Sequence, residues 1–535
     1  MRKQFLTAAF VIVVVNLMAV FFYPPILWSM IIFGPFLLIG LRDITQERQT
    51  IRRNFPVIGH FRYLLEAIRP EINQYFIESN TNGVPFSRED RSIVYQRAKK
   101  ELDTLPFGTQ KDVYAVGYEW INHSIMAKHV DKNTLRVTVG GPQCAQPYSA
   151  SLLNISAMSF GSISKNAVLA LNGGAKDGNF AHNTGEGGLS PYHMQPGGDL
   201  IWQIGTGYFS CRTPDGKFCE KSFQERAVLA NVKMIEIKIS QGAKPGHGGI
   251  LPAKKVSREI ADIRGVIMGE DVISPPSHSA FSTPMELMHF IARLRELSGG
   301  KPVGFKLCIG KRREFLAICK AMVKSVITPD YIAVDGGEGG TGAAPLEFSN
   351  NVGAPGIESL VFVNNALMGF DLRDRVRIIT SGKVTTAFGM IKRLALGADL
   401  IYSARAMMLA LGCIQALRCN TNACPTGVAT QDLELMRGLV VGDKRNRVAT
   451  FHGETIASVA HLLGAMGLER TSELRPWHIM RRVGPTDTRN YGELFERLKK
   501  GALLRNEIPE SFARAYRASD ADSFRNIVSQ PEIGY

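Results

Sequence analysis

The longest apolar runs of the chain lie near its N-terminus and predict a helical hairpin. The first run, Phe5–Tyr23, is interrupted at Asn16 and is close to the roughly 20 residues that cross a bilayer as a helix. Two prolines then end this helix, because proline removes a backbone donor. A second apolar run, Ile26–Leu41, follows them. We predict that residues 1–41 form a transmembrane hairpin; an incomplete second span is the alternative, because that run is short.

Positive charges at both ends of these runs predict their orientation. Arg2 and Lys3 precede the first run, and the second is followed by Arg42, Arg48, Arg52 and Arg53. Since Lys and Arg gather on the cytoplasmic side, we expect a protein of the cytoplasmic membrane (the bacterial inner membrane) with its catalytic domain facing the cytoplasm. A cleaved signal peptide is the alternative, although the first run is longer than a usual signal core and lacks a small-x-small cleavage site.

Residues 42–150 are predicted to be a helical connector. Apolar residues at helical spacing, Phe61, Leu64, Leu65 and Ile68, indicate an amphipathic helix. We expect this segment to be a collar that packs on the main domain.

From residue 151 the chain alternates short apolar runs with helical patterns. The candidate strands are Leu152–Met158, Phe180–Thr184, Met234–Ile239, Asp271–Ser274, Gly304–Cys308, Tyr331–Val334, Arg377–Thr380 and Leu400–Tyr402. The candidate helices are Lys165–Lys176, Pro284–Leu297, Arg313–Lys324, Gly356–Met368, Thr385–Leu396 and Ala404–Leu417. Such repetition is typical of an α/β (β/α)8 TIM barrel, with a doubly wound sheet as the alternative. We predict the barrel over residues 151–432 and a short helical C-terminal extension over 433–535.

The net charge of +15 and the pI near 9.4 raise the possibility of nucleic-acid binding. The basic residues are spread along the chain, however, without an interleaved aromatic and basic stripe. We therefore expect no nucleic-acid partner and attribute the charge to a membrane surface or an acidic redox partner. The eight cysteines show no disulfide framework, which favours a reducing compartment.

Glycine and small hydroxyl residues follow most of the predicted strands, for example in AMSFGSIS, NTGEGG and DGGEGGTGA. Small residues let a ligand approach the backbone closely. The last two loops, Ser381–Lys383 and Ser403-Ala404, take the usual phosphate position of a barrel. A phosphorylated cofactor such as FMN fits that site.

Three cysteines, Cys413, Cys419 and Cys424, are spaced C-x5-C-x4-C and are followed by a proline. Thiolates this close together suit a soft metal centre. Three ligands without a local fourth favour an iron–sulfur cluster of reduced iron count over a four-ligand zinc site. Three buried structural cysteines are the alternative.

Several segments together resemble the FMN-binding synthase domain of glutamate synthase, and in particular its short, membrane-anchored, stand-alone branch. They are NTGEGG, QGAKPGxGGxLPxxKV, SPP, GGTGAxP and CxxxxxCxTNxCPTGVATQ, in that order, between Leu152 and Asp432. The resemblance implies FMN, a [3Fe-4S] cluster held by the three cysteines, and reduction of 2-iminoglutarate, formed from 2-oxoglutarate and ammonia, to L-glutamate. It also implies an electron donor such as ferredoxin or a reductase subunit.

The resemblance also implies roles for single residues. Lys244 and Arg264 would balance substrate carboxylates, Gln241 would hydrogen-bond substrate or flavin, and Glu186 would move a proton at the imine nitrogen. The FMN contacts would be Ala157, Met158, Ser159, Gln241, Lys306, Gly339, Gly340, Gly382, Lys383, Ser403 and Ala404, with Lys306 stabilising the reduced flavin.

Two departures from the family pattern lie in the expected substrate region. His247 stands where the family has an acid, and Ile250 where it has a glutamine. The chain also begins with a hydrophobic run rather than a cysteine, so we expect that glutamine hydrolysis is not encoded. The alternatives are an oxidoreductase for a related amino acid or imine, and a non-catalytic flavin and iron–sulfur electron-transfer subunit.

Overall fold

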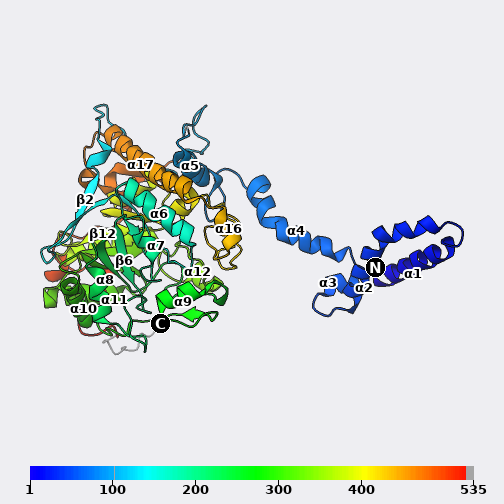
Figure 1. Cartoon of the computed structure of the whole chain (residues 1–535). Helices are drawn as coiled ribbons and strands as arrows, with labels where there is room; N and C mark the ends of the chain where they lie inside the picture. Colours follow the sequence, from blue (N-terminus) through cyan, green and yellow to red (C-terminus); the bar gives the residue numbers. More distant parts are fainter. Residues whose placement is uncertain (102, 526–535) are drawn as a thin grey trace, which may run out of the picture. The chain divides into compact units, whose positions relative to one another are not determined.

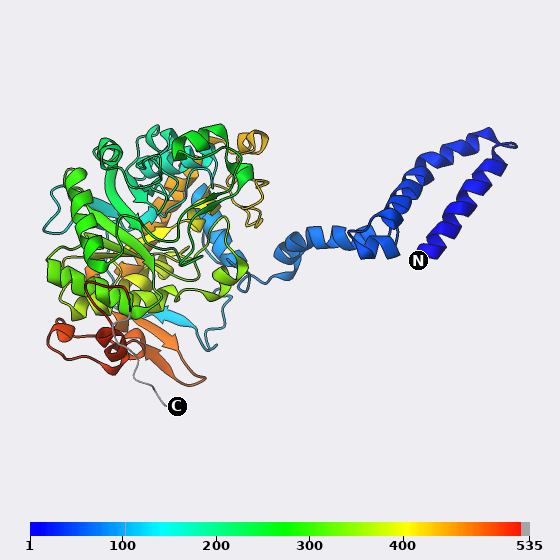
Figure 2. The same ribbon diagram turned by 90° about the horizontal axis from the view of Figure 1, so that it is seen from below.

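A computed structural model describes residues 1–101 and 103–525. The chain divides into two compact units, Met1–Val84 and Pro85–Tyr535, which Figures 1 and 2 show in two orientations. The first unit contains the predicted hairpin together with the first part of the predicted connector. The rest of that connector belongs to the second unit, with the barrel.

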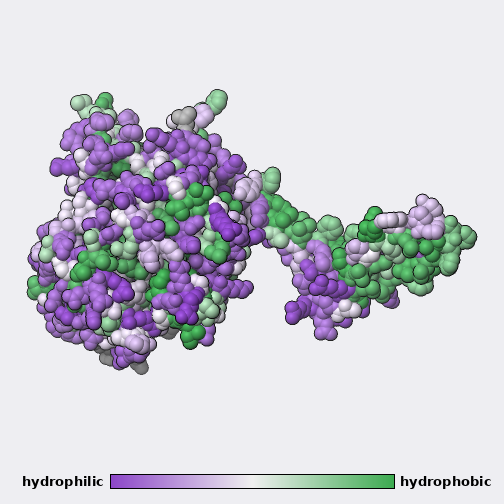
Figure 3. Space-filling model, in the orientation of Figure 1, coloured by the Kyte–Doolittle hydropathy of each residue, from purple (hydrophilic) through white to green (hydrophobic). Residues whose placement is uncertain are grey.

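The first unit consists of helices. They are α1 (Arg2–Ala19), η1 (Pro24–Ser29), α2 (Met30–Thr45), α3 (Thr50–Asn54), α4 (Gly59–Ile72) and η2 (Asn73–Ile77). By length and composition, α1 and the stretch Pro24–Thr45 could each cross a membrane, and only 6% of each apolar window is buried. Their exposed apolar side chains form the green surface of this unit in Figure 3. Asn16, the polar residue in the first run, accepts a hydrogen bond from the Ser29 hydroxyl of the connection.

The second unit is built on a closed barrel of parallel strands, so the predicted TIM barrel is confirmed. In chain order the strands are β4 (Leu153–Ile155), β5 (His182–Asn183), β6 (Leu200–Ile204), β7 (Val232–Lys238), β10 (Val303–Cys308), β11 (Tyr331–Asp335), β12 (Arg377–Thr380) and β13 (Leu400–Ser403). β13 pairs with β4, which closes the ring. The carboxyl ends of the strands therefore meet at one mouth, where barrel active sites lie.

Helices surround these strands, as Figure 1 shows. They are α6 (Lys165–Asp177), α7 (Pro191–Met194), α8 (Glu220–Ala227), α9 (Arg258–Arg264), α10 (Pro284–Leu297), α11 (Arg312–Ser325), α12 (Leu346–Asn351), α13 (Gly356–Gly369), α14 (Ala387–Ala395) and α15 (Arg405–Ala410). Most of the predicted helices agree with these bounds to within two residues. The helix predicted over Ala404–Leu417 ends early, at Ala410, so the cysteine segment beyond it is irregular.

Segments from both ends of the second unit pack around the barrel. The helices are α5 (Arg88–Lys99), α16 (Leu433–Arg437), α17 (Val441–Ala465), α18 (Tyr491–Leu494) and α19 (Glu510–Arg517), with short 3-10 turns at Lys132–Thr134, Ala253–Lys255, Thr471–Glu473, Pro476–His478 and Ala502–Leu504. The strands are β1 (Glu119–Ile121), β2 (Arg136–Val139), β3 (Tyr148–Ser151), β14 (Ile479–Arg482) and β15 (Thr488–Asn490). β1 pairs with β14, so a segment before the barrel and one after it share a sheet. The C-terminal extension thus contributes strands as well as helices.

One predicted barrel strand is wrong and one real strand was missed. Val272–Ile273 is strand β9, which pairs antiparallel with β8 (Ile250–Leu251) in a two-stranded ladder outside the barrel; α9 lies between the two strands in the sequence. The missed strand is β6, whose sequence LIWQI contains a glutamine that obscures its buried character. Gln203 is only 2% exposed, and its amide donates to Glu236 inside the barrel. A buried partner that lies far away in the sequence thus makes a polar residue compatible with the core.

A buried ion pair joins several elements at the opposite, N-terminal end of the barrel. Asp330, just before β11, accepts two hydrogen bonds from Arg295 of α10, and its side chain is 1% exposed. The same carboxylate accepts the backbone N–H groups of Val303 and Gly141. Removing one partner of such a pair leaves an uncompensated buried charge.

We predict that Asp330→Ala lowers the free energy of unfolding by about 3–5 kcal/mol, because Arg295 would lose its counter-ion in the core. The measurement is equilibrium unfolding of the detergent-solubilised protein, followed by tryptophan fluorescence. The control is Asp374→Ala, which breaks a pair with Lys500 whose side chains are 75% and 56% exposed and should cost at most about 1 kcal/mol. Equal losses in the two variants would contradict the structural role of Asp330.

Candidate functional site

A cavity lies at the carboxyl ends of the barrel strands. Its volume is about 530 Å³, including the part that opens to solvent. The lining residues are Phe86, Ser156, Ala157, Gln241, Lys306, Asp335, Gly339, Gly340, Ser381, Gly382, Lys383, Val384, Tyr402, Ser403, Ala404, Arg405 and Ala406. Nine of the eleven predicted FMN contacts are among them, whereas Met158 and Ser159 are not. Phe86 and Arg405 line the cavity without having been predicted.

The polar groups of this cavity suit a polar ligand. The amide nitrogen Nε2 of Gln241 is buried without a hydrogen-bond partner among the described residues. Lys306 of β10 is 5% exposed. Buried polar atoms are nearly always satisfied, so the orphaned amide and the enclosed ammonium favour a bound group that accepts hydrogen bonds. A flavin ring, with carbonyl and ring-nitrogen acceptors, meets that requirement.

Cations and tight loops shape the part of the cavity near β12 and β13. Gly382 has a φ of +117°, and a Cβ there would come within 2.6 Å of Glu338. The carbonyl of Gly382 accepts from Arg393, and Arg405 donates to the carbonyl of Glu338. Burial, followed by the nearby Arg405, lowers the pKa of Lys383. Two cations, Lys383 and Arg405, thus line the part of the cavity predicted for a phosphate.

The start of the second unit reaches the same cavity. Phe86 lies under the Arg405 guanidinium, which is 4.9 Å from the centre of the ring. Its backbone N–H donates to the side chain of Gln415, 3.1 Å away. Gln415 lies between two of the cluster cysteines, and its own N–H points at the Cys413 sulfur. Phe86 therefore links the cavity to the cysteine segment.

Beside the cavity, four charged residues come together at the ends of β5 and β7. Glu186, in the loop after β5, forms an ion pair with Lys238 at the end of β7, with 2.6 Å between Oε1 and Nζ. Lys244 donates to the carbonyl of Ala343, and Arg264 donates to that of Phe160. Lys238, Lys244 and Arg264 are 7%, 2% and 5% exposed. The predicted Glu186, Lys244 and Arg264 thus meet, and Lys238 joins them.

The four charged residues Glu186, Lys238, Lys244 and Arg264 together carry an excess of positive charge. Burial raises the pKa of Glu186. The nearby cations Lys238, Lys244 and Arg264 lower it by more, so that the pKa of Glu186 is lowered overall. Burial lowers the pKa of Lys244 to about 8 and that of Arg264 to about 10, against the opposing pull of Glu186. At neutral pH, Lys244 and Arg264 therefore carry their charges beside the Glu186–Lys238 ion pair. Buried charge of this kind calls for an anionic partner.

Glycines enclose the Glu186 carboxylate. A Cβ on Gly249 would lie 2.6 Å from Oε1, and one on Gly205 would lie 2.7 Å from the Glu186 Cβ. Gly249 directly precedes β8, so the β8–β9 ladder, of which only the β9 segment was wrongly predicted as a barrel strand, begins against the charged residues. The close approach explains the glycine-rich sequences on both sides.

The two departures from the family pattern, His247 and Ile250, lie at or next to strand β8. Ile250 pairs with Ile273 in the β8–β9 ladder, and His247 bonds its neighbour's carbonyl while its ring meets the edge of Phe348. Below the cluster, His278 bonds the carbonyl of Lys238 at 2.8 Å. Burial, the largest effect, lowers the pKa of His278 to about 4, so it is a neutral support for Lys238.

The three predicted cluster cysteines lie in the irregular segment after α15. All are free thiols, partly or fully buried. The described residues contain no group of three His, Cys, Asp or Glu side chains already arranged to hold a metal ion, so the cluster stays a prediction. Three sulfur donors suit a soft metal centre. Hydrogen bonds from Thr426 and backbone N–H groups outweigh burial and lower the pKa of Cys424, whereas burial raises the pKa of Cys413 to about 12 and also raises that of Cys419. Lys255, buried nearby, donates to the carbonyls of Ser162 and Ala429.

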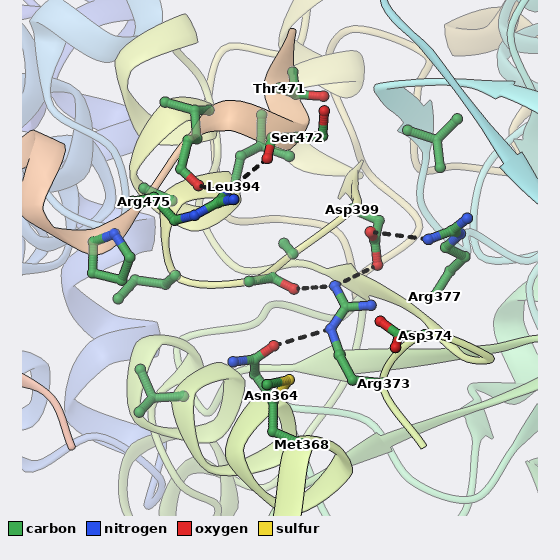
Figure 4. A pocket seen from close by; sticks show the side chains of 18 of the residues that line it. Asn364, Met368, Arg373, Asp374, Arg377, Leu394, Asp399, Thr471, Ser472 and Arg475 are labelled. Atoms are coloured by element: carbon green, nitrogen blue, oxygen red, sulfur yellow. Dashed lines mark hydrogen bonds and ion pairs between the residues drawn. The ribbon is translucent and has the colours of Figure 1, made fainter. Parts of the chain in front are cut away.

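A second, larger cavity, of about 1870 Å³ including the part that opens to solvent, lies at the opposite end of the strands. Figure 4 shows Arg373 held there by Asp399 and Asn364, and Arg475 turned to backbone carbonyls. None of the predicted site residues lines it. Because these arginines already have partners, we regard this cavity as part of the packing between barrel and extension.

Solved structures with a similar fold include a mandelate oxidase variant (TM-score 0.41, 13% identity, covering 79% of this chain and 99% of that one). Another is a flavocytochrome b2 variant (TM-score 0.42, 12% identity, covering 88% and 96%). Similarity at this level carries no argument about function.

Sequence relatives are closer. The chain is 36% identical over 485 residues to the glutamate synthase large subunit-like protein YerD of Bacillus subtilis, covering 83% of this chain and 92% of that protein. It is 33% identical over 360 residues to the archaeal glutamate synthase [NADPH] of Methanocaldococcus jannaschii, covering 67% of this chain but 66% of that protein. Residues 127–469 match the conserved region in glutamate synthase. The chain therefore belongs to the glutamate synthase family.

Proposed function

We propose that this chain is a membrane-anchored, glutamate synthase-like oxidoreductase that reduces 2-iminoglutarate, formed from 2-oxoglutarate and ammonia, to L-glutamate. Membership of the family makes it an oxidoreductase acting on CH–NH2 donors. The observation that carries the choice of substrate is the buried excess of cations around Glu186. The two negative charges of a dicarboxylate would neutralise this excess positive charge.

The cations divide the binding task by their geometry. Arg264 presents a planar guanidinium suited to bidentate pairing with one carboxylate, and its Nε is buried without a partner among the described residues. Lys244 supplies a point charge for the second carboxylate. Both are held by backbone carbonyls, so little ordering remains for the substrate to impose.

In this proposal the Glu186–Lys238 pair supplies the proton that the reduction requires. Reduction of an imine adds a hydride to carbon and a proton to nitrogen. Lys238 Nζ lies 2.6 Å from Glu186 Oε1, so the proton that reaches the substrate nitrogen would pass from the Lys238 ammonium through the Glu186 carboxylate, leaving Lys238 neutral until solvent reprotonates it. The neutral His278 donates a hydrogen bond from Nε2 to the backbone carbonyl of Lys238 and so helps to hold the end of β7 in place.

We propose that the cavity beside this cluster binds FMN, which when bound would supply the hydride. Gln241 would hydrogen-bond the ring, and Lys306 would stabilise negative charge on the reduced ring. Lys383, Arg405 and the backbone around Gly382 and Ser403 would hold the phosphate. The loops carrying Gly339 and Gly340 line the same cavity.

We propose that Cys413, Cys419 and Cys424 hold a [3Fe-4S] cluster that takes electrons from ferredoxin or a reductase subunit. Lys255 and the N–H groups around Cys424 would offset the negative charge of such a cluster. The Phe86–Gln415 contact joins this segment to the FMN cavity. Residues 1–41 would anchor the protein in the cytoplasmic membrane, with the barrel on the cytoplasmic side.

A related imine is a second candidate substrate, because of Ile250. It directly follows Gly249, whose backbone closes over Glu186, and it replaces an amide by an apolar side chain. Losing one hydrogen bond weakens binding of a polar substrate by about 1 kcal/mol. A keto acid with a more apolar side chain would lose less binding free energy, because it has no polar group that requires that hydrogen bond.

Anaerobic stopped-flow reoxidation tests the reaction. We expect the absorbance of photoreduced flavin to return to the oxidised level on mixing with 2-oxoglutarate plus ammonium, and not with either alone. Faster reoxidation with another keto acid plus ammonium would favour the related imine. Failure with every keto acid would favour the electron-transfer subunit.

The pKa of Lys244 predicts a pH dependence of binding. Below about pH 8 this group carries the charge that attracts a carboxylate, and above it the proton is lost, so affinity for 2-oxoglutarate should fall as the pH rises through 8. Lys244→Met should weaken binding about tenfold or more at pH 7, the equivalent of a lost hydrogen bond to a charged group, and flatten the profile between pH 7 and 9.

Titration of the flavin spectrum with 2-oxoglutarate measures this affinity. Lys254→Met is the matched control, since Lys254 lies on the surface of the same region and should keep the parent affinity and profile. An unchanged profile in Lys244→Met would remove its proposed role.

Cys419→Ser tests the cluster ligands. We expect loss of the [3Fe-4S] EPR signal and of most bound iron and sulfide, because serine binds iron poorly compared with a thiolate. Cys319→Ser is the control, as Cys319 lies buried in α11. A parent-like signal in Cys419→Ser would end the assignment.

A further inference from the structure

The apolar face of α4 is exposed in the first unit. Phe61, Leu64, Leu65 and Ile68, which the sequence suggested would pack as a collar, are 65%, 54%, 57% and 39% exposed. Their spacing places them on one side of the helix. On another side, Arg62 and Glu66 form an ion pair.

The starting point of α4 is tied to the end of α2. Asp43, in the last turn of α2, is 3% exposed. Its carboxylate accepts the N–H of Val57 and lies 2.9 Å from His60 Nε2. A Cβ on Gly59 would come within 2.9 Å of the Arg52 backbone, so α4 also begins in close contact with α3.

The end of α2 is where exposed apolar surface gives way to charge. Arg42, Arg48, Arg52 and Arg53 cluster there in the sequence, and Arg2 and Lys3 lie at the same end of the antiparallel hairpin. For a hairpin that crosses a bilayer, this basic end lies at the boundary between lipid and water. The tie through Asp43 then places the first turn of α4 at that boundary.

The composition of α4 argues against a third span. Arg62, Glu66, Arg69 and Glu71 lie within it, and among the described residues only α1 and Pro24–Thr45 qualify by length and composition as membrane spans. The π-helical turn that continues it exposes Phe76 and Ile77, at 84% and 69%. Large apolar side chains such as Phe are typical of the lipid-facing side of interfacial amphipathic helices.

We propose that α4 and η2 form an interfacial helix that lies in the membrane surface, with the stripe Phe61, Leu64, Leu65 and Ile68 in lipid. The inference rests on the proposed membrane anchor. The occupant of the stripe is the bilayer rather than the barrel or a second copy, because the stripe continues the exposed apolar surface of the same unit, visible in green in Figure 3. Each buried apolar side chain adds to the binding free energy.

Tryptophan quenching in the full-length protein, reconstituted in vesicles of brominated phosphatidylcholine, tests the proposal. Leu64→Trp places a probe on the stripe, and Glu66→Trp places one on the polar side. We expect the emission that Leu64→Trp adds to the parent to be mostly lost in brominated vesicles. The emission added by Glu66→Trp should persist there and be quenched by aqueous acrylamide instead.

Two other results would overturn the proposal. Quenching of the Leu64→Trp emission by acrylamide alone would place the stripe in water, and resistance to both quenchers would place it against protein. If Leu64→Trp does not reconstitute with its flavin, Leu65→Trp probes the same face.

Trp28, 73% exposed in the connection between α1 and α2, separates this proposal from the anchor itself. The difference in emission between the parent and Trp28→Phe should also be quenched by brominated lipid if the hairpin is inserted. Loss of that signal would mean that the anchor fails. Its presence without quenching of Leu64→Trp would contradict the interfacial helix alone.

Discussion

The buried charge around Glu186 is the constraint on which the functional end of this barrel depends. Three cationic side chains and one carboxylate are enclosed together, and Coulomb repulsion in a poorly hydrated site is strong. The protein accommodates it by fixing each cation on a partner: Lys238 on Glu186, Lys244 and Arg264 on backbone carbonyls. The remaining imbalance is a standing attraction for a dianion, and it makes the apo site less stable than the occupied one.

The barrel supplies the geometry for this arrangement. Parallel strands bring residues that are far apart in sequence to one mouth, so the loops after β5 and β7 meet while the cavity of Gln241 and Lys306 opens beside them. Gly205 and Gly249 approach the Glu186 side chain closely, and so let the β8–β9 ladder, which lies outside the barrel, cover the charges. The same strand pair carries Ile250, which directly follows the glycine that approaches the Glu186 carboxylate.

Much of this was predictable from local pattern. The barrel and most helix bounds follow from periodicity, and the strand-end loops from short glycine-rich segments, whereas Glu186, Lys244 and Arg264 were expected as site residues from the resemblance to the glutamate synthase family. Lys238 was missed because a lysine at a strand end has no local signal; only its pairing with Glu186 gives it meaning. Strand β6 was missed because Gln203 is compatible with the core only through Glu236, and β9 was misassigned because two-residue ladders and barrel strands have the same apolar pattern.

The contact of Phe86 with Arg405 and Gln415 has a mechanical consequence. Phe86 is the second residue of the barrel unit, so the polypeptide that arrives from the first unit is fastened to the wall of the cavity and to the cysteine segment at once. Ligands that order the cavity and the cysteine segment would also order the attachment at Phe86. By thermodynamic reciprocity, force applied through this attachment would change the affinity for those ligands. Cofactor binding and the rigidity of the attachment would thus be coupled.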